Sequence, residues 1–335
     1  MAKLHYFRIY SATGIYEPNP NMDVVLLSGD QVVVRLLGCN VYASVLDEWL
    51  IAPGKSFVDL ENGDKKRLQL RRNSCLAHSS SHATIYVNAS VPLANVDLQS
   101  IKNSEGAVLD KLPHKSIAAT AFGSVTTAIS LSRFKNISRN YDLILDGYYA
   151  FDEKSGGFQK LFPNNFSDSY TATKITDEEI LKVTALAEAL CQDGELRSVV
   201  DLFSDALTPH ESGHLHAFIA AWTGLEMFIA KQFKELQSSV EISIKGYPAH
   251  KVFSERMLDV MKDKYRLLDK FVALSNYYNE VDADDDISLF KNLKRVRDDF
   301  FHSMEGDIDS LPLDKTRELL EKYLKLYMGR DKRAG

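Results

Sequence analysis

The sequence predicts an α+β protein in which a mostly-β N-terminal domain is followed by an all-α C-terminal domain. Up to about residue 165, short runs of β-branched and aromatic residues are separated by turn signals. From Thr176 onward, apolar residues instead recur with the 3.6-residue period of a helix. The chain has 335 residues, enough for two cores of ordinary size. We therefore expect domains at residues 1–165 and 176–328, with a tail at 329–335.

Strand signals dominate the N-terminal half. They occur at residues 24–27, 31–37, 84–91, 116–122 and 141–151. The first two segments flank a Ser-Gly-Asp turn, as expected for a hairpin. Since no long helical period precedes Thr176, we expect a sandwich or a barrel-like domain.

Two polar stretches of this half invite a chemical interpretation. Residues 65–72 form a basic run with alternating leucines, which predicts either a solvated strand edge or a contact for an anionic partner. His78 and His82 have the spacing of a helical metal site, but the serines between them and the strand that follows favour a loop. The three cysteines lack Cys-x-x-Cys spacing, so we expect neither a metal site nor a disulfide framework.

The second half contains a series of helix signals. Thr176 and Glu179 form a capping-box pattern that opens the first helix. Further helices are predicted at 196–207, 215–236, 253–271, 289–302 and 314–328, with a connection at 239–250. The acidic run at 282–286 is interpreted as a charged loop and cap, and Gly329 as the residue after the last helix.

Charge and hydropathy restrict the classes of partner. Lys and Arg number 40 against 46 Asp and Glu, a formal net charge of −6. Because no global basic field exists, any nucleic-acid contact requires a local patch. The N-terminus lacks a signal-peptide pattern and no segment resembles a membrane span, which favours a cytoplasmic protein.

The helix predicted at 289–302 carries the strongest chemical signal. An apolar stripe of helical period is flanked by Arg297, Asp298 and His302. Asp298 and His302 share a face, whereas Arg297 and His302 are about 140° apart on the helix. Arginine matches phosphate oxygens and histidine transfers protons near neutral pH. The alternative is a solvated helix end whose dipole favours a protonated histidine.

A second helix strengthens the chemical interpretation. Residues 218–226 read Phe-Ile-Ala-Ala-Trp-Thr-Gly-Leu-Glu, and about seventy residues later comes the segment 289–302. In this order and in a helical frame, the two segments resemble the aromatic-x-x-Leu-Glu helix and the Arg-Asn-x-x-x-His helix of HEPN domains, in particular the Apea-like branch. The resemblance covers about residues 176–328, nearly half of the chain.

This resemblance implies a metal-independent endoribonuclease without a cofactor, of a kind often found in antiviral or toxin systems, with its site at a homodimer interface. Arg297 would bind the scissile phosphate and His302 would act as general acid or base. Glu226 would touch the motif helix and pair with Arg297 or with the second copy. Lys291, Lys294 and Arg295 supply local positive charge for RNA.

Asp298 departs from the family pattern, which usually has Asn there. Aspartate only accepts hydrogen bonds and repels phosphate, so it either weakens catalysis or marks a degenerate domain that serves as a scaffold or sensor. A contact with His302 would instead raise the pKa of the histidine. Met304 stands where a related nucleotide-transfer branch has Tyr, which argues against that branch. Family members commonly join the nuclease to a sensor module, so we expect residues 1–165 to recognise a trigger such as a protein.

Overall fold

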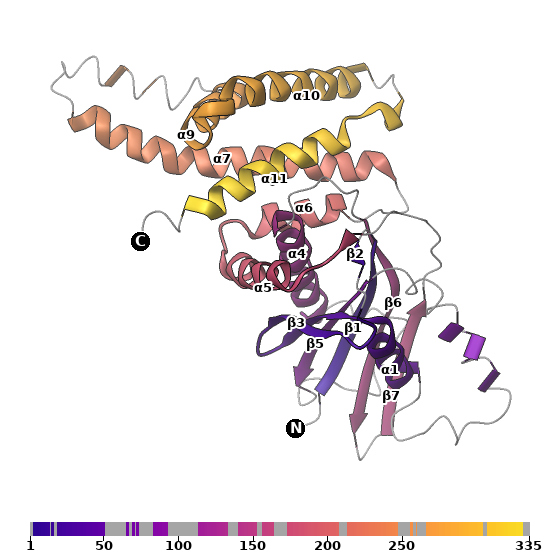
Figure 1. Ribbon diagram of the computed structural model, residues 1–335. Coiled ribbons are helices and arrows are strands. Elements are labelled where there is room, and N and C mark those ends of the chain that lie inside the picture. Colours follow the sequence, from indigo (N-terminus) through magenta and orange to yellow (C-terminus); the bar gives the residue numbers. More distant parts are fainter. Residues whose placement is uncertain are drawn as a thin grey trace. The chain divides into compact units, whose positions relative to one another are not determined.

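The computed structural model in Figure 1 comprises two compact units, Met1–Gln192 and Asp193–Gly335. The structure describes residues 3–13, 15–16, 19–50, 65–66, 69–70, 72–73, 83–92, 113–132, 140–152, 156–163, 173–207, 213–246, 255–256, 259, 266–303 and 307–330. The N-terminal unit contains the sheet and the C-terminal unit is helical, which confirms the α+β class.

The N-terminal unit is built on one six-stranded antiparallel sheet. Its strands are β1 (Lys3–Thr13), β3 (Asp23–Ser28), β4 (Val32–Leu37), β5 (Ala83–Pro92), β6 (Asn140–Asp152) and β7 (Gly156–Pro163). They lie in the order β3-β4-β5-β1-β6-β7, and a short parallel pair joins β2 (Ile15–Tyr16) to β8 (Thr173–Lys174). The expected hairpin and the strands at 84–91 and 141–151 are confirmed.

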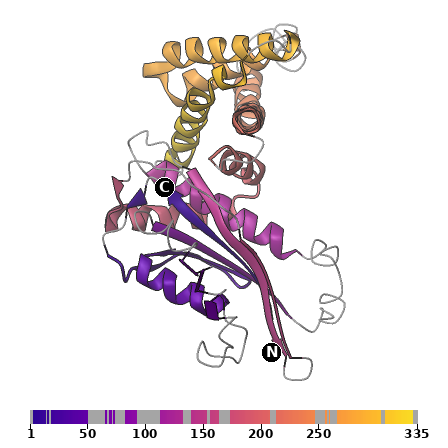
Figure 2. The same cartoon turned by 90° about the vertical axis from the view of Figure 1, so that its right-hand side faces the viewer.

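Helices cover both faces of this sheet. Successive side chains of a strand point to opposite faces. Phe7 and Ile9 of β1 accordingly pack in one core cluster with α1 (Cys39–Leu50), while Tyr10 stacks at 3.8 Å on Phe122 of α4 (His114–Ser132). Figure 2 views the sheet from near its edge, with α1 and α4 on opposite sides. The expected sandwich or barrel is therefore replaced by an open sheet between helices.

One predicted strand is a helix, and the described part of a second is helical. The segment 116–122 lies in α4, where every residue from Ala121 to Ser132 is buried. Burial all round removes the amphipathic period by which a helix is recognised. Of the basic run at 65–72, the described residues 65–66, 69–70 and 72 are helical, and the Arg72 Nε lies 2.6 Å from the Asp47 carboxylate of α1. His78 and His82 lie outside the described residues.

The helix α5 (Asp177–Gln192) moves the boundary between the units. Its predicted capping box is confirmed, since the Thr176 backbone N–H donates to Glu179 Oε2 at 2.8 Å and the Glu179 N–H donates to Thr176 Oγ1 at 3.2 Å. However, α5 packs beside α4, and its buried residue Val183 belongs to the first unit. The helical unit consequently begins after Gln192, later than the expected start at residue 176.

The C-terminal unit is a helical bundle arranged around α7. Its helices are α6 (Arg197–Leu207), α7 (His214–Gly246), α9 (Leu267–Tyr278), α10 (Ala283–Ser303) and α11 (Leu313–Arg330), with short 3-10 turns η4 (Glu280–Asp282) and η5 (Ile308–Ser310). Helix α7 packs against α6, α9 and α11. It continues into the segment expected as a connection, and α11 includes Gly329 rather than ending before it.

Aromatic stacking joins α10 to the bundle. Phe290 of α10 is fully buried and stacks on Trp222 of α7 at 5.6 Å and on Phe271 of α9 at 4.2 Å. Leu293, one turn later, is also fully buried. The inward face of α10 is thereby fixed, and the polar residues of its C-terminal half take positions at the edge of that face.

Candidate functional site

Arg297 lies in the C-terminal half of α10 and packs on aromatic rings. Its guanidinium carbon is 5.8 Å from the ring centroid of Trp222 on α7 and 5.5 Å from that of Phe301. Cations over aromatic faces are attracted by the ring quadrupole. The Arg297 side chain nevertheless keeps 36% of its surface exposed. The structure therefore presents a guanidinium that is held on two sides and still accessible.

The Asp298 carboxylate accepts hydrogen bonds from two cationic side chains of its own helix. The Arg297 Nη1 donates to Asp298 Oδ1 at 2.9 Å, and the Lys294 ammonium donates to the other carboxylate oxygen. Partial burial raises the pKa of Asp298, but the hydrogen bonds and charges of Lys294 and Arg297 together hold this pKa below its usual range. The contact considered between Asp298 and His302 is replaced by these two pairs.

His302 lies in the last turn of α10 and is exposed to solvent. Among the described residues it has no hydrogen bond or ion pair. Within that part of the chain, no hydrogen bond occupies either ring nitrogen of this exposed side chain. His302 directly follows Phe301, whose ring contacts Arg297, so the two functional groups of the motif lie at the same end of the helix.

Glu226 is partly buried on α7, one turn after Trp222. Within the described part of the chain Glu226 forms no ion pair, and Arg297 pairs with Asp298 instead of with Glu226. Of the expected RNA-binding cations, Lys291 and Arg295 are exposed on α10, and Arg295 donates to the Asn292 side chain at 3.0 Å. The structure brings together Trp222, Lys294, Arg297 and Asp298, and leaves Glu226 outside that set of contacts.

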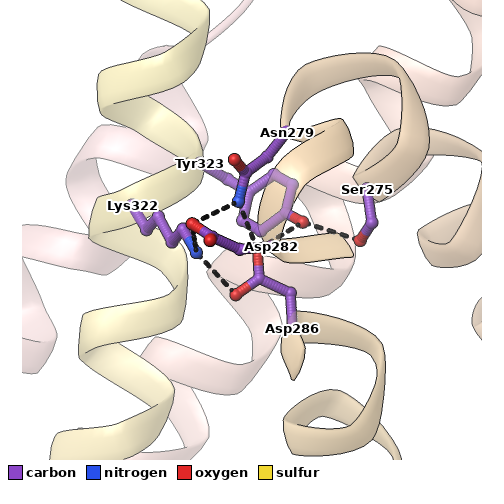
Figure 3. Close-up of polar contacts among 6 residues, drawn as sticks. All are labelled: Ser275, Asn279, Asp282, Asp286, Lys322 and Tyr323. Atoms are coloured by element: carbon purple, nitrogen blue, oxygen red, sulfur yellow. Dashed lines mark hydrogen bonds and ion pairs between the residues drawn. The ribbon is translucent and has the colours of Figure 1, made fainter. Parts of the chain in front are cut away.

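A buried polar network lies at the other end of α10 (Figure 3). Asp286, 5% exposed, accepts from Lys322 Nζ at 2.7 Å, from Tyr323 Oη at 3.1 Å and from Asn279 Nδ2 at 3.1 Å. The Tyr323 hydroxyl is also 2.6 Å from Ser275 Oγ. Three helices are joined by these bonds, because Ser275 belongs to α9, Asp286 to α10 and the Lys322–Tyr323 pair to α11.

This network holds α9, α10 and α11 together, and we call it the tie among these helices. Burial raises the pKa of Tyr323, and so does the negative charge of Asp286, which keeps the phenol protonated. Ser275 is fully buried, so its hydroxyl is closed to substrate. The sequence interpretation took residues 282–286 for a charged loop and cap. The signal it missed is that Asp286 precedes the buried Phe290 by four residues and so shares its face.

The described ranges contain no group of three or more His, Cys, Asp or Glu side chains that could hold a metal ion. Within those ranges no helix has the length and apolar character needed to cross a bilayer. Comparison with known proteins finds no family model, no curated protein and no solved structure that matches this chain.

Proposed function

We propose that the C-terminal unit is a metal-independent endoribonuclease of the HEPN type that acts as a homodimer in a regulated defence or toxin system. The observation that supports this proposal is the pairing of an accessible guanidinium, Arg297, packed on Trp222 and Phe301, with an exposed histidine at the same end of α10. Lys291 and Arg295 add exposed positive charge along this helix. The N-terminal unit takes the role of the sensor for a protein trigger.

The proposed reaction needs proton transfer and charge stabilisation. The RNA 2′-oxygen attacks the adjacent phosphorus, the 5′-oxygen leaves, and the products carry a 2′,3′-cyclic phosphate and a 5′-hydroxyl. His302 takes the proton of the 2′-hydroxyl or supplies one to the leaving oxygen, and Arg297 stabilises the charged phosphorane. One imidazole cannot do both in the same step. A two-fold dimer supplies a second His302 and a second Arg297.

The test is cleavage of structured RNA in the presence of a chelator, with analysis of the product ends for 2′,3′-cyclic phosphate. Removal of a general acid or base lowers rates by about 10²- to 10⁴-fold, so His302→Ala should lose cleavage on that scale. His216→Ala, at an exposed histidine on α7 outside the motif, is the matched control and should keep it. Wild-type cleavage that survives in His302→Ala would sink the assignment.

A non-catalytic scaffold or sensor is the second candidate. The observation in its favour is that Asp298 pairs with both Lys294 and Arg297, the cations that a phosphate would need. In that case neither the wild type nor Asp298→Asn cleaves RNA, while the wild type binds a protein partner tightly. Sedimentation of the purified chain over a range of concentrations tests the homodimer that the nuclease requires.

A further inference from the structure

Lys294, Asp298 and Arg297 form a small cluster on one helix in which two cations share one carboxylate. The side chains of Lys294 and Arg297 are 38% and 36% exposed, and that of Asp298 is 26% exposed. Exposed ion pairs on a helix contribute little to stability, because solvent screens them and side-chain entropy opposes them. An incoming anion therefore meets a carboxylate that is weakly held.

The Arg297 fork has donor capacity beyond the bond to Asp298. Guanidinium presents five N–H donors, and only Nη1 of Arg297 donates to Asp298. The Arg297 Nε is buried without a hydrogen-bond partner among the described residues, so the donors for an incoming anion are those of the two terminal nitrogens. The Asp298 carboxylate offers the same kind of anionic oxygen as a phosphodiester, which arginine also binds with its planar fork. Trp222 and Phe301 hold the guanidinium in place while its acceptor changes.

We infer that Asp298 is an internal competitor for phosphate: its carboxylate occupies Lys294 and Arg297 in the free protein, and a phosphodiester must displace it to bind. The inference rests on the proposed function, because it assigns this displacement to the RNA backbone. It gives the site a built-in restraint. Any event that draws Asp298 away from its two cations raises the affinity of the site for RNA.

Trp222 supplies a local reporter of this exchange. The chain has two tryptophans, so a Trp49→Phe background leaves Trp222 as the single indole emitter. Its ring lies 5.8 Å from the guanidinium carbon of Arg297. Because the emission of an indole responds to nearby charge, replacing the carboxylate by a phosphate should change the Trp222 fluorescence.

The probe is a short single-stranded oligodeoxynucleotide, which carries phosphodiesters but no 2′-hydroxyl and so cannot be cleaved by the proposed reaction. Affinity is measured by anisotropy of a labelled probe and by Trp222 emission at fixed ionic strength. Asp298→Asn should bind about threefold to tenfold more tightly than the wild type, and Asp298→Glu, which keeps the charge, should not. Asp285→Asn, at an exposed acid in the first turn of α10, controls for net charge.

A further variant tests whether the gain in probe affinity depends on Arg297. In the Asp298→Asn background, Arg297→Gln should abolish the gain in affinity and the change in emission. Unchanged or weaker binding by Asp298→Asn, with an unaltered unfolding transition, would overturn the inference and make Asp298 a clamp that positions Arg297. Tighter probe binding by Asp298→Asn without any RNA cleavage would keep the competitor and discard the nuclease, so the two failures are distinguishable.

Discussion

Asp146 of β6 is a partly buried carboxylate whose contacts offset only part of the cost of desolvation. It accepts a hydrogen bond from the Tyr6 hydroxyl at 3.2 Å and one from its own backbone N–H, and Arg8 and Lys115 lie near it. Desolvation raises the pKa of Asp146, although Arg8 and Tyr6 oppose the shift. A carboxyl whose pKa is higher in the folded state costs stability as the pH rises through the interval between its unfolded and folded pKa values.

We therefore expect Asp146→Asn to be more stable than the wild type at pH 7. This advantage should shrink as the pH falls toward about 3, below the unfolded pKa of about 3.9, where the carboxyl is largely neutral in both states. Denaturant unfolding at the two pH values measures it. Asp30→Asn, at an exposed turn, makes the same change in net charge and is the control. A variant less stable at pH 7 would mean that the contacts of the carboxylate outweigh its desolvation.

The candidate site shows which residue contacts a sequence can predict. Helical spacing places Arg297, Asp298 and His302 on one helix, and the structure confirms that helix as α10. Lys294 and His302 both lie four positions from Asp298. The spacing did not decide which of them contacts the carboxylate, because that depends on the side-chain rotamers. The contact of Arg297 with Trp222 depends on how α10 packs on α7, which local patterns do not carry.

At the scale of elements, the wrong strand prediction at 116–122 has a clear physical cause. Helix α4 packs against both the sheet and α5, so its apolar residues follow no single stripe. Its hydroxyl residues make bonds inside the helix, as when Thr126 Oγ1 donates to the Phe122 carbonyl at 3.0 Å. Small and β-branched residues in a fully buried helix therefore resemble a buried strand. The amphipathic helices α5 and α6, by contrast, were predicted nearly to the residue.

Tyr323→Phe tests the tie among α9, α10 and α11. The change removes the hydroxyl that bridges Ser275 and Asp286 and leaves both without that partner. A buried polar group without a partner has lost its bonds to water and gains no bond in the protein. We therefore expect the free energy of unfolding to fall by about 1–3 kcal/mol. Denaturant unfolding followed by circular dichroism measures it.

The companion change is Ser275→Ala, which leaves the bond from Tyr323 to Asp286 in place. It should cost about 0.5–1.5 kcal/mol, the usual contribution of one hydrogen bond. The double variant should cost less than the sum of the two single variants, since both remove the same bond. Additive losses would show that the two hydroxyls are not coupled in the folded protein.

At the scale of the molecule, each unit closes its own core. The sheet cluster around Phe7 and Tyr42 lies wholly in the first unit, and the cluster around Phe218 and Leu311 lies wholly in the second. The sequence showed the change from strands to helices but placed the boundary at that change. The structure places it after α5, because a helix belongs to the unit against which its apolar stripe packs.

This difference leads to a prediction about fragments. Residues 193–335 should fold alone into a helical protein with a cooperative thermal transition, since the buried aromatics of α7, α9, α10 and α11 pack against one another. Residues 176–335 add α5 without α4 and expose Val183, Ala187 and Leu190, which are buried in the intact chain. Such an apolar stripe favours association.

The two fragments are compared by circular dichroism, thermal melting and light scattering at equal concentrations. The longer fragment should scatter more, and Val183→Ser with Leu190→Ser in that fragment should reduce the scattering toward the level of the shorter one. Because the N-terminal unit is proposed to sense the trigger of a regulated nuclease, RNA cleavage by 193–335 relative to the full chain is measured in the same samples. A shorter fragment that fails to fold while the longer one melts cooperatively would return α5 to the helical unit.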